Sequence, residues 1–328
     1  MSRRVRSIRN APEQSRGRRA ARAAGLGVSA AVTSGLATGM YAWAVERVRF
    51  RLRRVAAPVL PPGSADVRVL HLSDLHLAPW QTMKHDFVRS LADLGPDLVV
   101  NTGDNLGHPD VLPQLRELLA PFRGVPGVFV YGSNDYFGPT LKNPFTYFFA
   151  RTPGGTKAPR LDVDGLDALL DELGWASLNN AATLVSAGGR QFRAVGVNDP
   201  HIGYDRPDAA IAALGSLPAA DASGNELPVL ALAHAPYRRI LDEFTRRGAA
   251  AIFAGHTHGG QVCLPGYGAL VTNCDVPREQ ARGLTAWRAG GRETALHVSA
   301  GLGTSIYSPV RFACPPEATL VTLTARSA

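Results

Sequence analysis

The stretch "AAIFAGHTHGGQ", from Ala250 to Gln261, joins a short apolar run to two histidines that lie one residue apart and to a pair of glycines. An apolar run of four to six residues is typical of a strand buried on both faces. His256 and His258 follow this run at i and i+2, so their side chains can point the same way. A histidine pair alone is weak evidence, because histidines also cap strands or lie satisfied in a core. Its meaning depends on the rest of the chain.

The same succession of an apolar run and a polar cluster occurs at four earlier places. "VRVLHL" ends in "SDLH", "DLVVN" in "TGDN", "GVFVY" in "GSND" and "VLALA" in "HAPY". Helix-like segments such as "KHDFVRSLADL" and "DVLPQLRELLAPF" lie between these runs, and such alternation predicts an α/β fold. Ligands of open α/β sheets bind beyond the carboxyl ends of the strands, so we expect the polar clusters to converge there.

The residues expected to converge are carboxylates and imidazoles. Imidazole and carboxylate together suit Mn, Fe or Zn rather than Ca²⁺ or Mg²⁺. Six such side chains are too many for one ordinary site, whereas two divalent or trivalent metal ions about 3.5–4 Å apart, bridged by a carboxylate, would use them all. Asp104 is the natural bridge. The predicted ligands are Asp74, His76, Asp104, His234, His256 and His258, with Ser133 and Asn134 beside them.

These motifs, in this order, resemble the calcineurin-like metallophosphoesterases from about Val67 onward. The form "GHTHGGQ", together with an apolar segment near the amino terminus, is similar to the YkuE-like bacterial branch that is associated with membranes. The resemblance implies an α/β fold, a four-layer α/β/β/α sandwich, and hydrolysis of a phosphoester by attack of a metal-bound hydroxide. It assigns the ligands to two metals: Asp74, His76, Asp104 and His258 to one, and Asp104, His234 and His256 to the other. The glycines after His258 are expected to let the backbone approach the ions, or simply to form a tight turn.

One motif departs from the family pattern. Where the family has G-N-H-D, this chain has "GSND", from Gly132 to Asp135. Aligned without a gap, Ser133 replaces the asparagine ligand and Asn134 replaces the histidine that is credited with protonating the leaving group. Asn134 is predicted to serve as a ligand in place of Ser133, unless a water fills the position, and we expect Asn134 and Asp104 to act at the phosphate. Neither arrangement restores a proton donor.

The missing donor bears on the substrate. Loss of general acid help costs ~10²–10⁴-fold on a poor leaving group and far less on a good one, which favours pyrophosphate bonds and activated diesters. His108 and His201 are candidate replacement donors, although either is also typical of a solvated loop. The remaining histidines, which we interpret as structural, are His71, His85 and His297.

The charge of the chain is concentrated near its amino terminus. The formal net charge is +8 over 328 residues. Residues 1–54 hold 13 Arg against two Glu, a balance of 13 − 2 = +11, which leaves 8 − 11 = −3 for residues 55–328. A slightly acidic body offers no broad cationic face for the ~6–10 phosphate contacts of a duplex binder. A nucleic-acid duplex is therefore not expected as a partner.

The uncharged run from Ala23 to Val45 is long enough to cross a bilayer, although it is rich in Gly, Ala, Ser and Thr. We predict a basic arm at 1–22, a transmembrane or signal-anchor helix at 23–45, a strand and linker at 46–66 and the metallophosphoesterase domain at 67–328. A cleaved export signal or a disordered tail is the alternative to the anchor. The predicted location is membrane-associated with undetermined orientation, because five Arg follow the run between Arg47 and Arg54. Alternation of Val48, Phe50 and Leu52 with arginines predicts a strand there.

Two further features leave alternatives open. Cys263 and Cys274 could form a disulfide outside the cytoplasm, or all three cysteines, Cys314 included, could be inert core residues. The aromatic and Pro-rich stretch from Tyr136 to Arg160 could be a lid, a loop that contacts lipid, or a satellite core.

Three functions fit the sequence. The first is a membrane-tethered phosphohydrolase that acts on a phosphorylated or nucleotide-linked lipid or envelope intermediate, with membrane lipid as a partner. The second is the same enzyme with a soluble phosphoester as substrate. The third is a metal-binding scaffold whose catalysis is weakened by "GSND", although six costly buried ligands argue against it. The sequence does not fix the oligomeric state.

Overall fold

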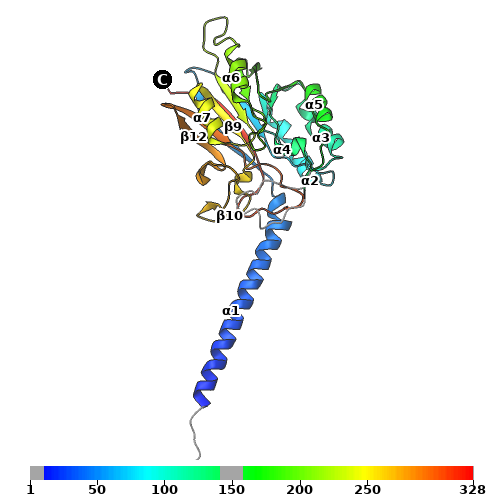
Figure 1. The fold of residues 1–328 in the computed structure, drawn as a ribbon, viewed down its shortest axis with the longest axis vertical. Helices are drawn as coiled ribbons and strands as arrows, with labels where there is room; N and C mark the ends of the chain where they lie inside the picture. Colours follow the sequence, from blue (N-terminus) through cyan, green and yellow to red (C-terminus); the bar gives the residue numbers. More distant parts are fainter. Residues whose placement is uncertain (1–10, 141–157, 328) are drawn as a thin grey trace, which may run out of the picture.

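Two six-stranded sheets, packed face to face, form the body of the protein in this computed structural model, which describes residues 11–140 and 158–327 (Figure 1). In the first sheet, β2 to β5 are parallel, and β14 lies between β2 and β1, antiparallel to β2 and parallel to β1. Its strands, in spatial order, are β1 (Arg51–Leu60), β14 (Glu317–Ala325), β2 (Val67–Leu72), β3 (Leu98–Asn101), β4 (Gly127–Phe129) and β5 (Trp175–Ser177).

The second sheet has parallel strands at its centre and an antiparallel pair at each edge. A small hairpin, β10 (Cys263–Leu264) and β11 (Gly268–Ala269), follows β9. The strands of the second sheet, in spatial order, are β12 (Gly283–Ala289), β13 (Arg292–Val298), β9 (Ala249–Ala254), β8 (Val229–Ala233), β7 (Arg190–Gly196) and β6 (Ala181–Ala187).

Helices cover the outer face of each sheet. On the first sheet, α2, α3 and α5 bury Val88, Leu115 and Leu166, while α6 and α7 bury Leu214 and Phe244 on the second. Short 3₁₀ turns connect the elements at η1 (Glu46–Val48), η2 (Leu91–Leu94), η3 (Ala120–Phe122), η5 (His258–Gly260) and η6 (Arg278–Gln280). The domain helices are α2 (Thr82–Ser90), α3 (Leu112–Leu119), α4 (Ser133–Tyr136), α5 (Val163–Glu172), α6 (Pro207–Gly215) and α7 (Arg238–Arg246).

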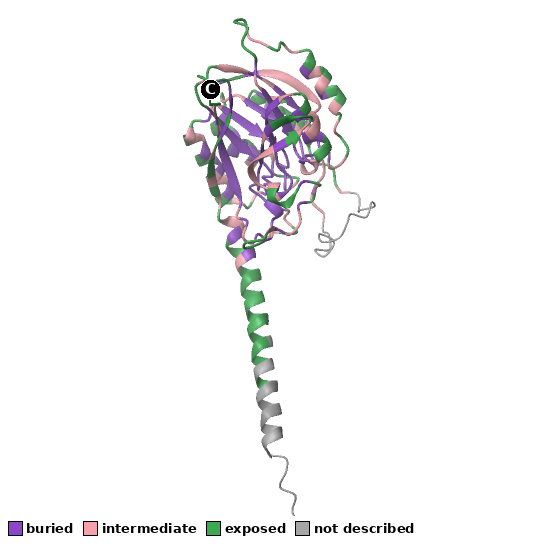
Figure 2. Ribbon diagram, turned by 90° about the vertical axis from the view of Figure 1, so that its left-hand side faces the viewer, coloured by how far each residue is buried: buried purple, intermediate pink, exposed green. Residues whose placement is uncertain are grey.

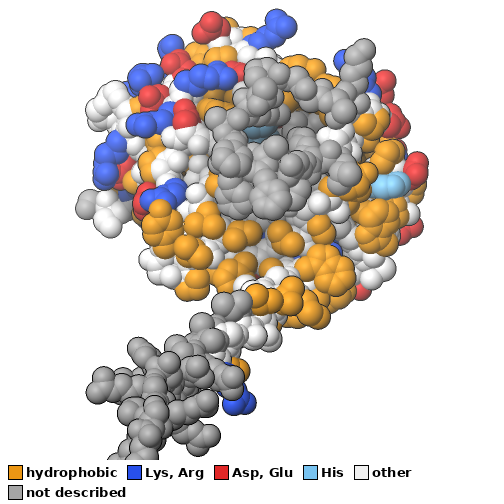
Figure 3. Space-filling model, turned by 60° about the horizontal axis from the view of Figure 1, so that its bottom comes forward, with side chains coloured by type: hydrophobic (Ala, Val, Ile, Leu, Met, Phe, Trp, Pro, Cys, Tyr) orange, Lys and Arg blue, Asp and Glu red, His pale blue; other side chains and the backbone are white. Residues whose placement is uncertain are grey.

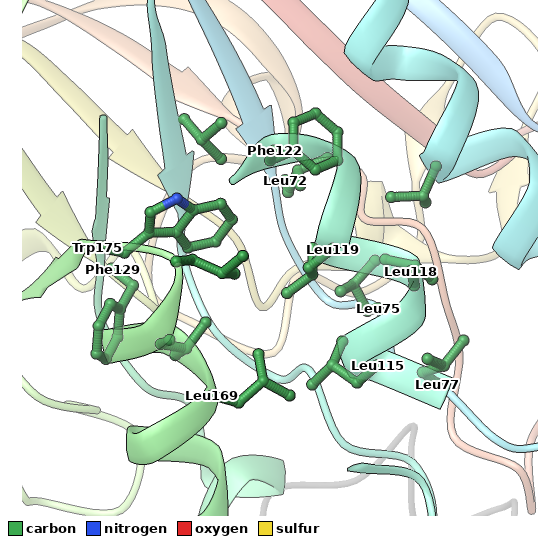
Figure 4. Close-up of a cluster of buried hydrophobic side chains, with 14 of the residues drawn as sticks. Leu72, Leu75, Leu77, Leu115, Leu118, Leu119, Phe122, Phe129, Leu169 and Trp175 are labelled. Carbon is green, nitrogen blue, oxygen red and sulfur yellow. The ribbon is translucent and has the colours of Figure 1, made fainter. Parts of the chain in front are cut away.

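Three apolar clusters hold these layers together. The cluster between the two sheets contains Val69, Val100, Leu230 and Phe253, so the strands at the centre are apolar on both faces. Figure 4 shows the outer cluster of the first sheet, where leucines of α3 meet Trp175 of β5. Burial of one large apolar side chain stabilises the fold by about 1.5–3 kcal/mol. Figure 2 shows the buried strands enclosed by more exposed helices, which is the layer order α/β/β/α that the resemblance implied.

A pair of histidines joins the two sheets within the core. His71 of β2 and His297 of β13 approach with their Nδ1 atoms 2.8 Å apart, and the Nε2 atom of His71 lies 2.9 Å from the Thr102 hydroxyl. Burial lowers the pKa of both imidazoles, that of His297 to about 3. Both rings are therefore neutral near neutral pH.

The amino-terminal segment forms α1 (Ala11–Ala44), which leaves the domain as a single projecting helix (Figures 1 and 2). No helix within 11–140 and 158–327 is both long and apolar enough to cross a membrane. The predicted transmembrane helix at 23–45 and the predicted membrane-associated location are therefore wrong. Gly, Ala, Ser and Thr supply length without much hydrophobicity, and that explains why the run met the length requirement alone.

The arginine-rich segment after α1 begins as η1 and becomes strand β1 only at Arg51, so the alternating pattern at Val48 and Phe50 precedes the strand. Arg53 of this strand donates two hydrogen bonds to the buried carboxylate of Glu317. The three cysteines are free thiols, and Cys263 Sγ donates a hydrogen bond to Gly259 O instead of pairing with Cys274. Most of the aromatic stretch, from 141 to 157, lies outside the described residues.

Candidate metal centre

The polar clusters predicted at strand ends follow β2, β3, β4, β8 and β9. The fold brings two groups of potential ligands together, with donor atoms within 4.8 Å of one another in each group. One group contains Asp74, His76 and His258, and the other contains Asp74, Asp104 and His234. His234 and His258 lie more than a hundred residues after Asp74, His76 and Asp104, so it is the parallel strand order that assembles the site.

The outer ring nitrogens of three histidines face backbone carbonyls. His234 Nδ1 lies 2.7 Å from Thr102 O, and His258 Nδ1 lies 3.0 Å from Gly303 O. His256 Nε2 lies 3.3 Å from Asn273 O. A carbonyl can only accept, so each of these nitrogens carries the hydrogen and the opposite nitrogen presents a lone pair. This is the way a protein orients imidazole toward a metal.

The inner ring nitrogens face other acceptors. His258 Nε2 is 3.6 Å from Asp74 Oδ1, and His234 Nε2 is 3.6 Å from Asp104 Oδ2. Ring nitrogens and carboxylate oxygens gathered at these distances can share a cation, either a proton or a metal ion. The residues therefore fit metal ions of the kind that imidazole and carboxylate prefer.

Asp104 lies between the two predicted ligand sets. Its Oδ2 atom is 3.4 Å from His76 Nε2 in one set and 3.6 Å from His234 Nε2 in the other. His256 completes the arrangement, since its Nδ1 atom is 3.3 Å from His234 Nε2. The distribution of these residues over two ions stays a prediction, and the position of Asp104 suits a bridge.

The electrostatics of the centre favour positive charge. Burial raises the pKa of Asp104, but His234 and His76 outweigh burial and lower the pKa to about 2. Burial lowers the pKa of His234, but the carboxylates of Asp104, Asp199 and Asp74 outweigh it and raise the pKa to about 9. Carboxylates that draw a proton onto a fully buried imidazole would hold a metal cation in the same place.

The backbone of the predicted ligands is unusual. Asp74, His76, Asp104, His256 and His258 all have positive φ, between 39° and 67°. Left-handed backbone is uncommon for residues other than glycine and costs of order 1–3 kcal/mol each, so it persists where surrounding structure enforces it, often at functional sites. The strain aims these side chains into one volume, and no sequence pattern announces it.

Two glycines, Gly132 and Gly255, lie so close to predicted ligands that a side chain would not fit. A Cβ on Gly132 would lie 2.3 Å from Asp104 Oδ1, and one on Gly255 would lie 2.5 Å from Asp74 Oδ2. Gly259 and Gly260, after His258, instead approach Cys314 and Ala269 and have positive φ. Their positive φ suits the tight turn, which was the alternative, and an approach of their backbone to the ions stays a prediction.

The "GSND" segment forms the short helix α4 beside the centre. The backbone amide of Asn134 donates to Asp104 Oδ1 at 2.7 Å, and its side-chain Nδ2 donates to Asp104 Oδ2 at 2.8 Å. Ser133 lies next to Asn134, with Oγ 3.4 Å from that Nδ2. The fold thus brings Asn134 to the expected bridge, where its side chain serves Asp104 as a hydrogen-bond donor. A ligand role for Asn134 stays a prediction.

The remaining candidate histidines differ in how close they lie to the metal centre. His201 lies against the centre, with its ring 4.2 Å from that of His256 and its Nδ1 3.0 Å from the Tyr237 hydroxyl. His108 instead contacts Trp80 and accepts from the Asp110 amide. His85 is half-buried on α2, near Asp86 and Glu117. His201 is therefore the candidate proton donor that the geometry favours.

Two buried charged residues were missed by sequence reasoning. The Asp135 carboxylate accepts from the backbone amides of Asp104, Asn105 and Gly132 at 2.8–2.9 Å, which fixes the loop that carries Asp104. Its place in "GSND" is the available signal. Arg311 is fully buried and donates to the carbonyls of Ala300, Gly301, Gly303 and Cys314, of which Gly303 accepts from His258. Nothing in the sequence separates Arg311 from other arginines.

Comparison with known proteins identifies the family of this chain. The profile of the family described as calcineurin-like phosphoesterase matches residues 67–260. The metallophosphoesterase YkuE of Bacillus subtilis is 27% identical over 278 residues, which are 82% of this chain and 83% of that protein. The phosphodiesterase YaeI of Escherichia coli is 27% identical over 285 residues, which are 84% of this chain and 88% of that protein. The chain belongs to the calcineurin-like phosphoesterase family and is a hydrolase that acts on phosphoester bonds.

Proposed function

We propose that the protein hydrolyses phosphodiesters and other phosphoesters with good leaving groups, in a reaction that requires two metal ions. The observation that carries the proposal is the orientation of the site. Outer imidazole nitrogens are held by backbone carbonyls, and inner nitrogens face the carboxylates of Asp74 and Asp104. Mn, Fe or Zn suits this donor set.

When bound, two such ions would neutralise the phosphate oxygens and lower the pKa of a water near phosphorus. The chain supplies the rest of the chemistry. Two hydrogen bonds from Asn134 orient the Asp104 carboxylate, and Asp135 holds the backbone of Asp104. His201, whose ring lies 4.2 Å from that of His256, would return a proton to the leaving group.

The substrate class follows from the altered motif. No histidine stands in "GSND", so ester bonds with good leaving groups would be cut fastest. The relative YaeI is named a phosphodiesterase, and this supports a diester. A nucleotide-linked or lipid-linked diester is our first substrate, and a soluble phosphoester is the alternative.

Metal analysis tests the proposal together with turnover. Purified protein should contain up to two equivalents of metal, and a chelator should abolish hydrolysis of bis(4-nitrophenyl) phosphate, which returns on adding Mn²⁺ or Zn²⁺. Asp104→Asn should lose at least one equivalent and about 100-fold or more in turnover, because the variant lacks one carboxylate charge between two histidines. Asp221→Asn is the matched control, since Asp221 lies in a surface turn.

Two results would contradict the proposal. Unchanged metal content in Asp104→Asn would remove the two-metal assignment. Full metal loading without turnover of any monoester or diester would favour a scaffold with weakened catalysis, the alternative that the "GSND" motif supports.

A further inference from the structure

A buried carboxylate follows β7, next to the strand that carries His234. β7 and β8 are parallel neighbours in the second sheet, with Gly196 opposite Leu232. Asp199 comes three residues after the end of β7, and His234 comes directly after β8. Neighbouring strands lie about 4.8 Å apart, so both residues leave the sheet at the same carboxyl edge. Asp199 therefore belongs to the strand ends that converge on the candidate metal centre.

One oxygen of the Asp199 carboxylate has no partner. Acidic side chains such as those drawn red in Figure 3 lie at the surface, where water solvates them, whereas Asp199 is fully buried. Its Oδ1 atom accepts from the His201 amide at 2.7 Å, but Oδ2 has no hydrogen-bond partner within residues 11–140 and 158–327. Glu317 also has an unpartnered oxygen, yet its other oxygen is paired with Arg53. An interior carboxylate without such a pair is costly unless a cation compensates it.

The charge of Asp199 lies on the side of the centre that has fewer carboxylates. One predicted ligand set has a carboxylate of its own, Asp74, in addition to the bridging Asp104. The other set has the bridge and two imidazoles, those of His234 and His256. Asp199 raises the pKa of His234 more than Asp74 does, which agrees with a position near that imidazole. Burial raises the pKa of Asp199 itself to about 6, so its carboxylate is ionised well above that pH.

We propose that Asp199 is a further residue of the metal centre, whose carboxylate supplies negative charge to the ion on the His234 side. The inference rests on the proposed function, in which the centre binds two ions. Each ion would then have one carboxylate of its own, Asp74 for one and Asp199 for the other, besides the shared Asp104. The cation itself would compensate the buried charge of Asp199. Ser133, which stands at the asparagine position of the family motif, leaves room for such a contribution.

Calorimetric titration of the metal-free protein with Mn²⁺, well above pH 6, tests this role. Asp199→Asn keeps an acceptor oxygen for the His201 amide and removes the charge. The binding step that is lost in His234→Ala should weaken about 10–100-fold in Asp199→Asn, as for other residues that tune a metal site. The step that is lost in His76→Ala should stay nearly unchanged.

The melting temperature distinguishes this role from a purely structural one. Metal-free Asp199→Asn should melt at the same temperature as the unmodified protein or higher, because the variant no longer buries an unpaired charge. Mn²⁺ should raise the melting temperature less in the variant, since tighter metal binding stabilises the folded state more. A residue that only supports the fold would show the opposite, a lower melting temperature without metal and unchanged Mn²⁺ affinities.

The matched control is Asp205→Asn. Asp205 lies six residues further along the same segment and pairs with Arg239 of α7, so its variant should leave both Mn²⁺ affinities unchanged. Two bound ions with unchanged affinities in Asp199→Asn, or equal weakening of both steps, would overturn the inference and keep the proposed function. One bound ion whose affinity depends on Asp199 would keep the inference and overturn the two-metal proposal. Absence of Mn²⁺ binding by the unmodified protein would overturn both.

Discussion

At the scale of single residues, the proposed chemistry depends on Asn134 and His201, because the GSND motif differs from the family pattern. Asn134 stands where a proton-donating histidine is expected, yet its two hydrogen bonds go to Asp104. His201 lies against His256 instead. The residue that we propose as proton donor and the residue that supports the predicted metal bridge therefore come from different segments of the chain.

Rebuilding the family motif tests this division. Ser133→Asn combined with Asn134→His should raise hydrolysis of alkyl phosphates much more than of nitrophenyl esters, because acid help matters in proportion to leaving-group basicity. Each single change should give less than half of the gain of the double variant, since ligand and acid act as one unit.

His201→Ala should lower alkyl ester hydrolysis by about 10²-fold and nitrophenyl ester hydrolysis far less. An equal response on both ester classes would exclude His201 as the donor.

Asp135 is a second single-residue test. Its carboxylate accepts from three backbone amides around Asp104, and Asp135→Asn keeps the shape while it replaces one acceptor oxygen by a donor. We expect metal affinity to fall about 10–100-fold, as for other residues that orient ligands. Titration of the metal-free protein with Zn²⁺ measures it. Unchanged affinity would restrict Asp135 to folding.

At the scale of elements, the two sheets are joined by the His71–His297 pair of β2 and β13. Both folded pKa values lie below the ordinary value of 6.5, and burial is the first cause. Below pH 6.5 the unfolded chain binds protons that the folded chain excludes. Stability is therefore full above pH 6.5 and is lost as the pH falls below it, by up to about 1.4 kcal/mol per pH unit for each excluded proton.

A variant of one partner isolates this effect. His297→Gln keeps a polar partner for His71, and the glutamine side chain does not titrate. The decrease in unfolding free energy between pH 6.5 and 5 should therefore be smaller in this variant, by up to the contribution of one excluded proton. Urea denaturation of the metal-free protein at several pH values measures the slope. His85→Gln is the control, since His85 is partly exposed and lies on α2, outside the contact between the two sheets, and an identical slope in both variants would contradict the assignment.

At the scale of the whole molecule, the base of α1 is part of the domain although the helix projects from it. The Arg311 amide donates to Ala42 O, and the Cys314 amide donates to the buried Glu46 carboxylate at 2.7 Å. Deletion of residues 1–40 should leave turnover of a small diester within a few fold, because no predicted ligand lies there. Glu46→Ala should lower the melting temperature by a few degrees, since an unsatisfied buried amide costs ~1–3 kcal/mol. Calorimetry gives the melting temperatures of both variants. A larger decrease in the deletion variant than in Glu46→Ala would mean that the projecting helix itself stabilises the domain.

The sequence predicted the parts of this molecule that depend on local pattern. Apolar runs that end in polar clusters identified β2, β3, β4, β8 and β9, because buried parallel strands read as continuous hydrophobic segments. What it could not predict depends on tertiary contacts. The positive φ of His76 and the burial of Arg311 have no local signal. The predicted membrane helix is wrong because the run meets the length requirement, whereas its Gly, Ala, Ser and Thr residues supply too little hydrophobicity.

The strand order sets a condition on synthesis. β1 pairs with β14 alone, and Arg53 of β1 reaches Glu317 of β14 across 264 residues of sequence. β1 leaves the ribosome long before β14 has been synthesised. β1 therefore stays unpaired until nearly all of the domain has been translated. An unpaired strand edge exposes backbone hydrogen-bonding groups and invites association with other chains. We therefore expect nascent chains stalled before residue 317 to be chaperone clients, and release of the final strand to be the event that fixes α1 to the domain.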